Sequence, residues 1–157
     1  MNYTSDIVDK FPEVEVSLIS FNNYGGRAVF EGAVETLQVN GDNALVRDAL
    51  SRKVEGSVLV VDGGASFKTA LLGGNLAALA NSNGWSGIVI YGCIRDIQEI
   101  KTVNIGCKAL GSSPRKSKKS GIGSVNIPLY LSSIIIKPHS YVYCDLDGLV
   151  LAPERLI

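Results

Sequence analysis

The chain has 157 residues, of which 46% are hydrophobic and 19% are charged. This length and apolar content are enough for one substantial core without help from a metal or a disulfide, so we expect a single domain over residues 1–157. Fifteen basic residues balance fifteen acidic ones, which excludes a global field that would draw the protein to nucleic acid or to an anionic membrane.

The amino-terminal part predicts a short helix followed by a strand pair. Ser5-Asp6 can cap a helix through Phe11, because a side-chain oxygen there accepts a free backbone N–H of the first turn, and Pro12 then ends the helix. A turn signal at 24–26 precedes apolar residues that alternate over 28–39. We expect this stretch to be a strand pair bent at its glycine.

The middle of the chain alternates helical and strand patterns. From Asp42, which can serve as an N-cap, apolar residues recur at helical spacing through Leu50. An apolar strand over 57–61 follows, then a second helix over 75–83, and then an apolar strand over 87–91 that leads into a further helical start. This order predicts a βαβ core with parallel strands.

The pattern changes after Gly106. Residues 111–123 are rich in Gly, Ser and Lys, and this segment predicts a loop. Short apolar segments then predict strands over 125–131, 133–136, 141–144 and 149–152. The carboxyl third is therefore expected to be mostly β-structure.

The three cysteines, Cys93, Cys107 and Cys144, are odd in number and form no Cys-x-x-Cys pair. They are typical of reduced thiols in a cytosolic protein. The amino terminus has neither a basic start nor an apolar stretch, and no apolar run approaches the roughly 18 residues that a bilayer span needs. We therefore expect a cytoplasmic protein with no membrane partner.

Two loops stand where an apolar strand leads into a helix, which is where α/β sheets usually place ligand sites. The first loop is Leu72-Gly73-Gly74-Asn75-Leu76. Its glycines let a ligand approach the backbone, and the free N–H groups at the helix start suit a carboxylate or a phosphate. Glycines before a helix also serve a turn and tight packing alone, so this loop by itself leaves both interpretations open.

The second loop runs from Tyr91 to Glu99. Asp96 and Glu99 are three residues apart, so on a helix both carboxylates lie on the same face. Arg95 would be rotated from Asp96 by about 100° around the helix axis. Hard carboxylate oxygens suit Mg²⁺ or Mn²⁺, which binds through few protein ligands and several waters. Acidic residues are also favoured in a solvated first turn, so this pattern alone leaves that alternative open.

The spacing between the two loops resembles a family signature. Gly74 is followed by twenty residues, then by Arg95-Asp96, two further residues and Glu99. This resembles the Gly-x20-Arg-Asp-x2-(Glu/Asp) pattern of the RraA-like family, which contains regulators of ribonuclease E activity and 4-hydroxy-4-methyl-2-oxoglutarate aldolases. Further segments that resemble the family lie at 23–28, 58–64, 125–128 and 143–148.

The resemblance implies a swivelling β/β/α domain of the α/β class, assembled as a homotrimer or hexamer with the site between subunits. It also implies a role for each residue of the two loops. The substrate carboxylate would be bound by Gly73, Gly74, Asn75 and Leu76, and the pyruvoyl oxygens would be contacted by Arg95. Asp96 would ligate a divalent metal (Mg²⁺ or Mn²⁺), and Glu99 would tune the shell of ligands around that metal.

The activity that the resemblance implies is metal-dependent cleavage of 4-hydroxy-4-methyl-2-oxoglutarate to pyruvate, with Arg95 and Asp96 as catalytic residues. Cleavage leaves a pyruvate enolate, whose charge a metal and a guanidinium stabilise. The same enolate forms when oxaloacetate loses CO₂, so we expect oxaloacetate decarboxylase activity as well. The alternative is a non-catalytic regulator that binds and inhibits ribonuclease E.

Two departures from the family bear on this choice. Asn75 stands where many members have an acidic residue, and longer aldolases supply a further carboxylate through a carboxyl extension, whereas this chain stops at Ile157. Asp96 favours catalysis, because members known as pure regulators tend to lack the acid after the arginine.

The remaining reactive side chains have simpler interpretations. His139, the only histidine, is expected in a surface turn, and Cys93 is expected to be a small buried thiol without chemistry. The basic run of Arg115, Lys116, Lys118 and Lys119 could face an anion or RNA, but charge runs in Gly/Ser loops are usually solvated. We expect RNA binding to be absent, or non-specific and sensitive to salt.

Overall fold

The computed structural model describes residues 3–157. The helices are α1 (Thr4–Lys10), α2 (Ala44–Leu50), α3 (Gly74–Ser82) and α4 (Ile97–Ile100). The strands are β1 (Glu15–Val16), β2 (Asn22–Asn23), β3 (Phe30–Val39), β4 (Val58–Asp62), β5 (Ala70–Leu72), β6 (Gly87–Ile94), β7 (Gly106–Ser112), β8 (Gly123–Val125), β9 (Leu129–Leu131), β10 (Ile134–Ile136), β11 (Tyr141–Cys144) and β12 (Leu149–Ala152).

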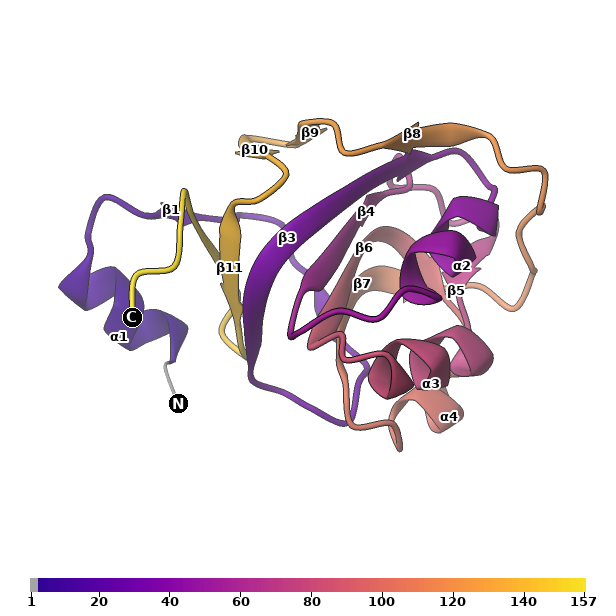
Figure 1. The fold of residues 1–157 in the computed structure, drawn as a ribbon, viewed down its shortest axis with the longest axis horizontal. Coiled ribbons are helices and arrows are strands. Elements are labelled where there is room, and N and C mark those ends of the chain that lie inside the picture. Colours follow the sequence, from indigo (N-terminus) through magenta and orange to yellow (C-terminus); the bar gives the residue numbers. More distant parts are fainter. Residues whose placement is uncertain (1–2) are drawn as a thin grey trace.

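Most strands join one mixed sheet in the order β1-β12-β11-β3-β4-β6-β7-β2. The central strands β3, β4, β6 and β7 run parallel to one another, whereas β11, β12 and β1 are added in antiparallel pairs. In Figure 1, α2, α3 and α4 lie together on one side of the parallel strands. The α/β class and the parallel βαβ core predicted from the sequence are confirmed.

The sheet separates two apolar clusters, and strand β4 contacts both of them. Leu59 and Val61 pack into the cluster beneath α2 and α3, while Val58 and Val60 pack into the cluster on the opposite face, with β9, β10 and β11. Successive side chains of a strand point to opposite faces, so a strand covered on both faces must be apolar at every position.

The predicted strand pair over 28–39 is wrong, because β3 is one continuous strand of 10 residues. Gly32 does not bend it. A Cβ added at Gly32 would overlap the carbonyl oxygen of Gly56, so the glycine permits a close approach of the neighbouring turn. The predicted strand over 125–131 is also wrong, because Asn126 adopts a positive φ of 56° and separates β8 from β9.

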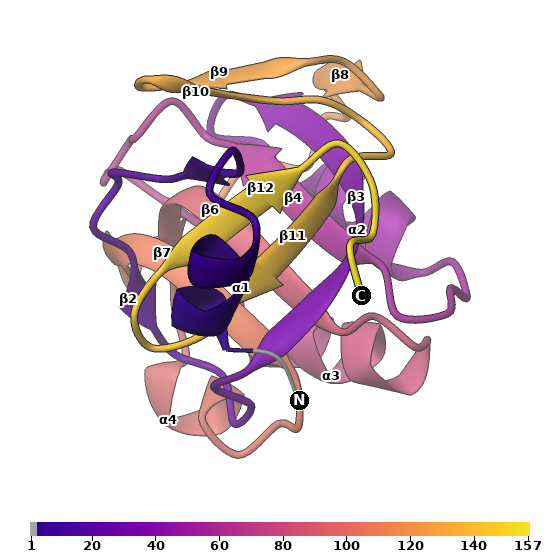
Figure 2. The same cartoon turned by 90° about the vertical axis from the view of Figure 1, so that its left-hand side faces the viewer.

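The predicted cap of the first helix is also wrong. Helix α1 begins at Thr4 and has no side-chain cap from its own N-cap residue. Instead, the Asp145 carboxylate accepts hydrogen bonds from the Thr4 N–H and from Thr4 Oγ1, both at 2.7 Å. The cap therefore comes from the far end of the chain and fastens α1 against β11 and β12, where Figure 2 shows it.

Asp145 provides a stability prediction with a defined pH dependence. Burial alone would raise the pKa of this carboxyl, but the hydrogen bonds from Thr4, Asp147 and Gly148 outweigh burial and lower the pKa below its ordinary value of 3.8. Replacing Asp145 with Ala is expected to lower the free energy of unfolding by roughly 2 kcal/mol at neutral pH, because buried N–H groups lose a charged acceptor.

A carboxyl group whose pKa is lower in the folded state than in the unfolded state stabilises the protein at pH values above its unfolded-state pKa. This stabilisation is lost as the pH falls through the folded-state pKa. In urea denaturation, the difference between the unmodified protein and Asp145→Ala should therefore shrink between about pH 7 and about pH 3. Asp147→Ala, at an exposed neighbouring carboxylate, is the matched control and should change stability little. An equal effect of Asp145→Ala at both pH values would contradict this account.

Among residues 3–157, no helix is long and apolar enough to cross a membrane. Cys93, Cys107 and Cys144 are buried, free thiols, as expected from the sequence. Burial raises the pKa of Cys107 and of Cys144 to about 12 and also raises the pKa of Cys93. None of the three is activated as a nucleophile, since the thiolate is the reactive form.

Candidate active site

The two loops singled out in the sequence lie side by side at one edge of the sheet. Strand β5 pairs in parallel with the end of β6, with Ala70 opposite Cys93 and Leu72 opposite Ile94. The Arg95 N–H then donates to the carbonyl oxygen of Leu72 at 2.9 Å. Because parallel strands end at the same edge, the loop after β5 and the loop after β6 meet there.

Asp96 connects these two loops. Its Oδ2 accepts the backbone N–H of Gly74 at 2.9 Å, so it caps the start of α3 from a different segment. Asp96 itself adopts a left-handed conformation with φ of 59° and precedes α4. The prediction that Asp96 and Glu99 share a helix face is therefore wrong in detail, because only Glu99 lies within the short helix.

Both carboxylates nevertheless reach the glycines. A Cβ added at Gly73 would lie 2.8 Å from Asp96 Oδ2, and a Cβ added at Gly74 would overlap Glu99 Oε2. The two glycines are thus needed because Asp96 and Glu99 occupy the space that side chains would fill. This packing explains why the four signature positions are linked across twenty intervening residues.

Arg95 is half-buried beside the same glycines. Its Nε would lie 3.7 Å from a Cβ at Gly73, and its Nη1 donates a long hydrogen bond of 3.4 Å to the carbonyl oxygen of Pro114. Among residues 3–157 it forms no ion pair, because the one salt bridge in that range joins Arg52 and Glu35. The guanidinium is therefore held next to the loop with its charge available to a ligand.

A cavity of about 110 Å³ opens between the glycine loop, α2 and the loop after β7. Its size suits several waters or a small organic anion. The residues around it are Asn43, Arg47, Ala70, Leu72, Gly73, Asn75, Leu76, Arg95, Asp96, Lys116, Ser117 and Lys119. Four of these side chains are cationic and only Asp96 is anionic, so the cavity favours an anion.

The donor set around Asp96 fits a weakly chelated divalent cation. Residues 3–157 contain no group of three or more His, Cys, Asp or Glu side chains close enough to hold a metal. Asp96 is exposed, and one of its two oxygens accepts the Gly74 N–H while Oδ1 accepts no hydrogen bond within that range. Mg²⁺ commonly binds through one or two carboxylates and keeps its other waters, so a single carboxylate oxygen is compatible with it.

The structure brings every sequence-predicted site residue to this edge. The cavity is lined by Gly73, Asn75, Leu76, Arg95 and Asp96, and the Glu99 side chain packs against Gly74 in the same loop. His139 lies in a turn with a φ of 69°, as expected.

Three of the four cations around the cavity were not predicted as site residues from the sequence. Arg47 was not singled out in the sequence, and Lys116 and Lys119 were expected in a solvated loop, yet all three line the cavity. Their location depends on long-range pairing of the loop with β5 and with the start of α2. No local pattern in the sequence indicates this pairing.

Comparisons with known proteins point to one family. Residues 4–151 match the RraA-like (Aldolase/RraA) family model. The chain is 49% identical over 151 residues to a Thermus thermophilus protein named 4-hydroxy-4-methyl-2-oxoglutarate aldolase, and the match covers 96% of this chain and 92% of that protein.

Two solved structures have nearly the same fold. One, described as the RNA-processing inhibitor RraA from Thermus thermophilus, has a TM-score of 0.97 at 46% identity and covers 100% of this chain and 96% of that one. The other, described as an S-adenosylmethionine:2-dimethylmenaquinone methyltransferase from Geobacillus kaustophilus, has a TM-score of 0.97 at 44% identity, with 99% and 97% covered. These relatives carry three functional names on one fold, so the choice among the functions depends on the site.

Proposed function

Because the chain belongs to the RraA-like family, we propose that it is a divalent-metal-dependent aldolase that cleaves 4-hydroxy-4-methyl-2-oxoglutarate to pyruvate. We include oxaloacetate decarboxylation as a second activity of the same site. The observation that carries the proposal is the meeting of Asp96 and Glu99 at the Gly73-Gly74 backbone beside the unpaired Arg95. This arrangement combines an anion-binding loop, a cation and a carboxylate within one small cavity.

The residues of the site suit the two ends of the reaction. The first-turn N–H groups of α3 have no partner within the helix, so those beyond Gly74 are available to the substrate's C1 carboxylate. Arg95, next to that loop, stabilises the negative charge that develops on the C2 oxygen when the C3–C4 bond breaks. Asp96 would hold the divalent metal, with Glu99 nearby, and the metal supplies Lewis-acid stabilisation of the same charge.

The same residues explain the second activity. Loss of CO₂ from oxaloacetate also places negative charge on the C2 oxygen, so Arg95 serves both reactions. In the aldol cleavage the C4 hydroxyl also gives up its proton to water as C4 becomes the carbonyl carbon of a second pyruvate. In either case the enolate is then protonated at C3 to give pyruvate. We expect the two activities to respond in parallel to substitutions of Arg95 and Asp96, because both depend on stabilising one oxygen.

Pyruvate release from oxaloacetate, with and without Mg²⁺, tests this proposal. The blank is Mg²⁺ without protein, because the free metal also promotes the reaction. We expect a protein-dependent rate above that blank, and its loss when EDTA is added. A rate equal to the blank with both Mg²⁺ and Mn²⁺ would reject the catalytic proposal.

A second role is favoured by one observation, the near-identical fold of the relative described as an RNA-processing inhibitor. Under this proposal the chain binds ribonuclease E and inhibits it. An RNA cleavage assay with purified ribonuclease E tests it. Asp96→Asn should leave inhibition unchanged, because inhibition through a protein surface does not use the carboxylate charge; no inhibition by excess unmodified protein would reject this role.

We also propose that the chain assembles as a homotrimer or hexamer. Several large apolar side chains of the carboxyl third are exposed, among them Ile122, Val125, Tyr130 and Leu146, and exposed apolar groups of this kind favour contact with another copy. We expect light scattering at micromolar protein to give a mass of three or six times 16.7 kDa. A monomeric mass under these conditions would contradict the assembly.

A further inference from the structure

The connection between β7 and β8, residues 113–122, is bonded to the candidate site at its first residues. The Ser113 N–H donates to the carbonyl oxygen of Ile94, the last residue of β6, at 3.0 Å. The carbonyl oxygen of Pro114 accepts a hydrogen bond of 3.4 Å from the Arg95 guanidinium. The β7–β8 connection therefore lies against the loop that follows β6.

The middle of the β7–β8 connection is bonded to β5, the strand that leads into the glycine loop (residues 72–76). The Ala70 N–H donates to the carbonyl oxygen of Arg115 at 2.8 Å, and Ser117 Oγ donates to the carbonyl oxygen of Ala70 at 2.6 Å. Ala70 and Lys116 also form an isolated parallel bridge. The short strand β5 is thus bonded both to β6 and to the β7–β8 connection, and the glycine loop starts from it.

Asp42, just before α2, fastens the end of the β7–β8 connection. Its buried carboxylate accepts the backbone N–H groups of Ser120 at 2.9 Å, Gly121 at 3.0 Å and Ile122 at 3.3 Å, and it also accepts that of Ala44 at 3.0 Å. The hydrogen bond from Ala44, together with those from the connection, lowers the pKa of Asp42 against the opposing effect of burial. The carboxylate is therefore ionised at neutral pH.

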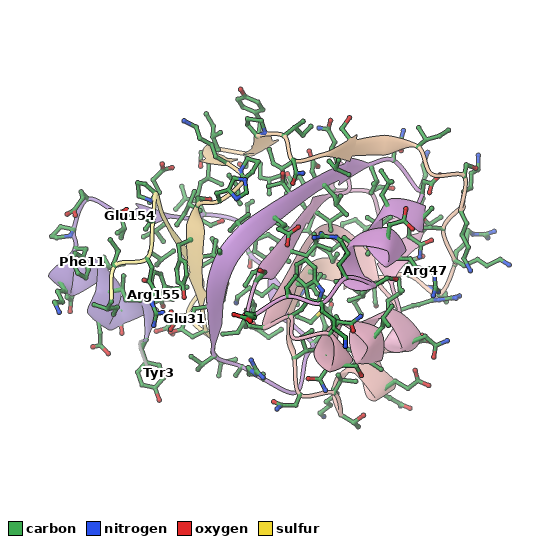
Figure 3. All side chains as sticks on the ribbon, in the orientation of Figure 1. Tyr3, Phe11, Glu31, Arg47, Glu154 and Arg155 are labelled. Atoms are coloured by element: carbon green, nitrogen blue, oxygen red, sulfur yellow. The ribbon has the colours of Figure 1, made fainter. Side chains whose placement is uncertain are left out.

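The neighbours of Asp42 add backbone hydrogen bonds to the same segment. The Lys118 N–H donates to the carbonyl oxygen of Gly41, and the Asn43 N–H donates to the carbonyl oxygen of Lys118, each at 2.9 Å. In Figure 1 the chain between β7 and β8 passes beside α2, and Figure 3 shows the labelled Arg47 of α2 at this end of the molecule. Three successive residues, with Asp42 in the middle, thus hold the second half of the connection.

We propose that Asp42 is a positioning residue of the candidate active site, which acts through the β7–β8 connection to keep Arg95 and the glycine loop in the orientation that stabilises the enolate. The inference rests on the proposed function for the reaction itself. Asp42 does not line the cavity, so its effect passes through the segment that it holds.

The chemistry of the Asp42 contacts explains why a carboxylate is needed. Three successive N–H groups converge on it from residues 120–122, and an ionised carboxylate can accept all of them because it carries no hydrogen of its own. An amide in its place would direct an NH₂ group at one of these donors or at the Ala44 N–H. A misplacement of about 1 Å near the reacting atoms can lower a rate on the order of 100-fold, so a shift of this segment has a measurable effect on catalysis.

The variant Asp42→Asn tests the positioning role with little change in side-chain size. We expect kcat for pyruvate formation from 4-hydroxy-4-methyl-2-oxoglutarate to fall about tenfold or more, because Arg95 and the glycine loop lose their common support. The assay is run at a temperature at which circular dichroism shows the variant to be folded, so that the rate refers to folded protein.

Asp145→Asn is the matched control. Asp145 is also a buried carboxylate that accepts backbone N–H groups, but it holds α1, which Figure 1 places at the opposite end of the molecule from α2. This variant should lower stability and leave kcat of the folded protein within about twofold of the unmodified value. An equal loss of kcat in Asp42→Asn and Asp145→Asn would show a merely structural role and would overturn the inference.

Amide hydrogen exchange tests the same inference without turnover. Asp42→Asn should accelerate exchange in residues 113–122 about tenfold or more, because the segment opens locally when its acceptor is lost. Exchange should also rise in residues 70–76, since the Ala70 N–H is bonded to the β7–β8 connection. Asp145→Asn should change exchange in both segments less than about twofold. Unchanged exchange in residues 70–76 of Asp42→Asn would overturn the inference.

Ser117→Ala provides a second variant in case Asp42→Asn does not fold. It removes the 2.6 Å hydrogen bond to Ala70 and leaves Asp42 in place. Exchange in residues 70–76 should rise about fivefold or more, whereas exchange in residues 120–122 should stay within about twofold. No rise in residues 70–76 would show that the β7–β8 connection does not support β5, and would overturn the inference.

Turnover and exchange separate this inference from the proposed function. No turnover by the unmodified protein would reject the proposed function, and exchange in residues 70–76 would still decide whether Asp42 positions the glycine loop. Turnover by the unmodified protein with an equal kcat in Asp42→Asn would keep the proposed function and overturn the positioning role.

Discussion

Replacing Asp96 with Asn is expected to lower the rate of pyruvate formation by about 100-fold or more, because the proposed metal site loses its anionic ligand. The fold should persist, since an amide oxygen can still accept the Gly74 N–H that Asp96 Oδ2 accepts at 2.9 Å. Steady-state kinetics with saturating Mg²⁺, together with circular dichroism of the variant, measure the two effects separately.

Two further variants sharpen this result. Asp96→Ala removes the cap of α3 as well as the charge, so it should also lower the free energy of unfolding by about 1 kcal/mol. Glu99→Gln should reduce the rate by only about 10- to 100-fold, because we place Glu99 in support of the ligand and not in direct contact with the metal. Full activity of Asp96→Asn would show that this carboxylate does not hold the metal.

Replacing Arg95 with Ala is expected to lower the pyruvate-forming rate by about 100-fold or more, because the developing enolate loses its guanidinium. The substitution removes one long hydrogen bond of 3.4 Å to Pro114, so the loss of stability should be small. Both the aldol and the decarboxylation rates should fall by similar factors in the same preparation.

Arg115→Ala, a neighbouring arginine outside the cavity, is the matched control for Arg95→Ala and should keep the full rate. Arg95→Lys should give an intermediate rate, since it keeps a positive charge but loses the planar fork of donors. If Arg95→Ala and Arg115→Ala lose activity equally, the loss comes from the general positive charge and the assigned role of Arg95 is wrong.

The parallel core was predictable because its signals are local. The apolar run of β4 and the helical periodicity of α2 are each visible within a few consecutive residues, and the structure confirms both elements. The strand β5, by contrast, has only three residues and exists because it pairs with the end of β6. Short strands that depend on such pairing have no periodicity of their own to detect.

In the candidate site, too, some residues were predictable from the sequence and others were not. Arg95, Asp96 and the glycines were recognised through the spacing of the family signature, and the structure adds the reason for that spacing, the contact of two carboxylates with two glycines. The cap of α3 by Asp96 joins segments that are far apart in sequence, and so do the hydrogen bonds that the Asp42 carboxylate accepts from the backbone of residues 120–122. Neither contact follows from composition or local pattern, because both depend on the completed sheet.

The central claim is that the cavity beside Arg95 and Asp96 cleaves 4-hydroxy-4-methyl-2-oxoglutarate. Breaking its C3–C4 bond yields pyruvate from both halves, whereas decarboxylation of oxaloacetate yields a single pyruvate. The most direct measurement is the amount of pyruvate formed per molecule of this substrate consumed, with Mg²⁺ and again with excess EDTA. We predict two molecules of pyruvate per substrate with Mg²⁺ and no turnover with EDTA; unconsumed substrate with both Mg²⁺ and Mn²⁺ would contradict the claim.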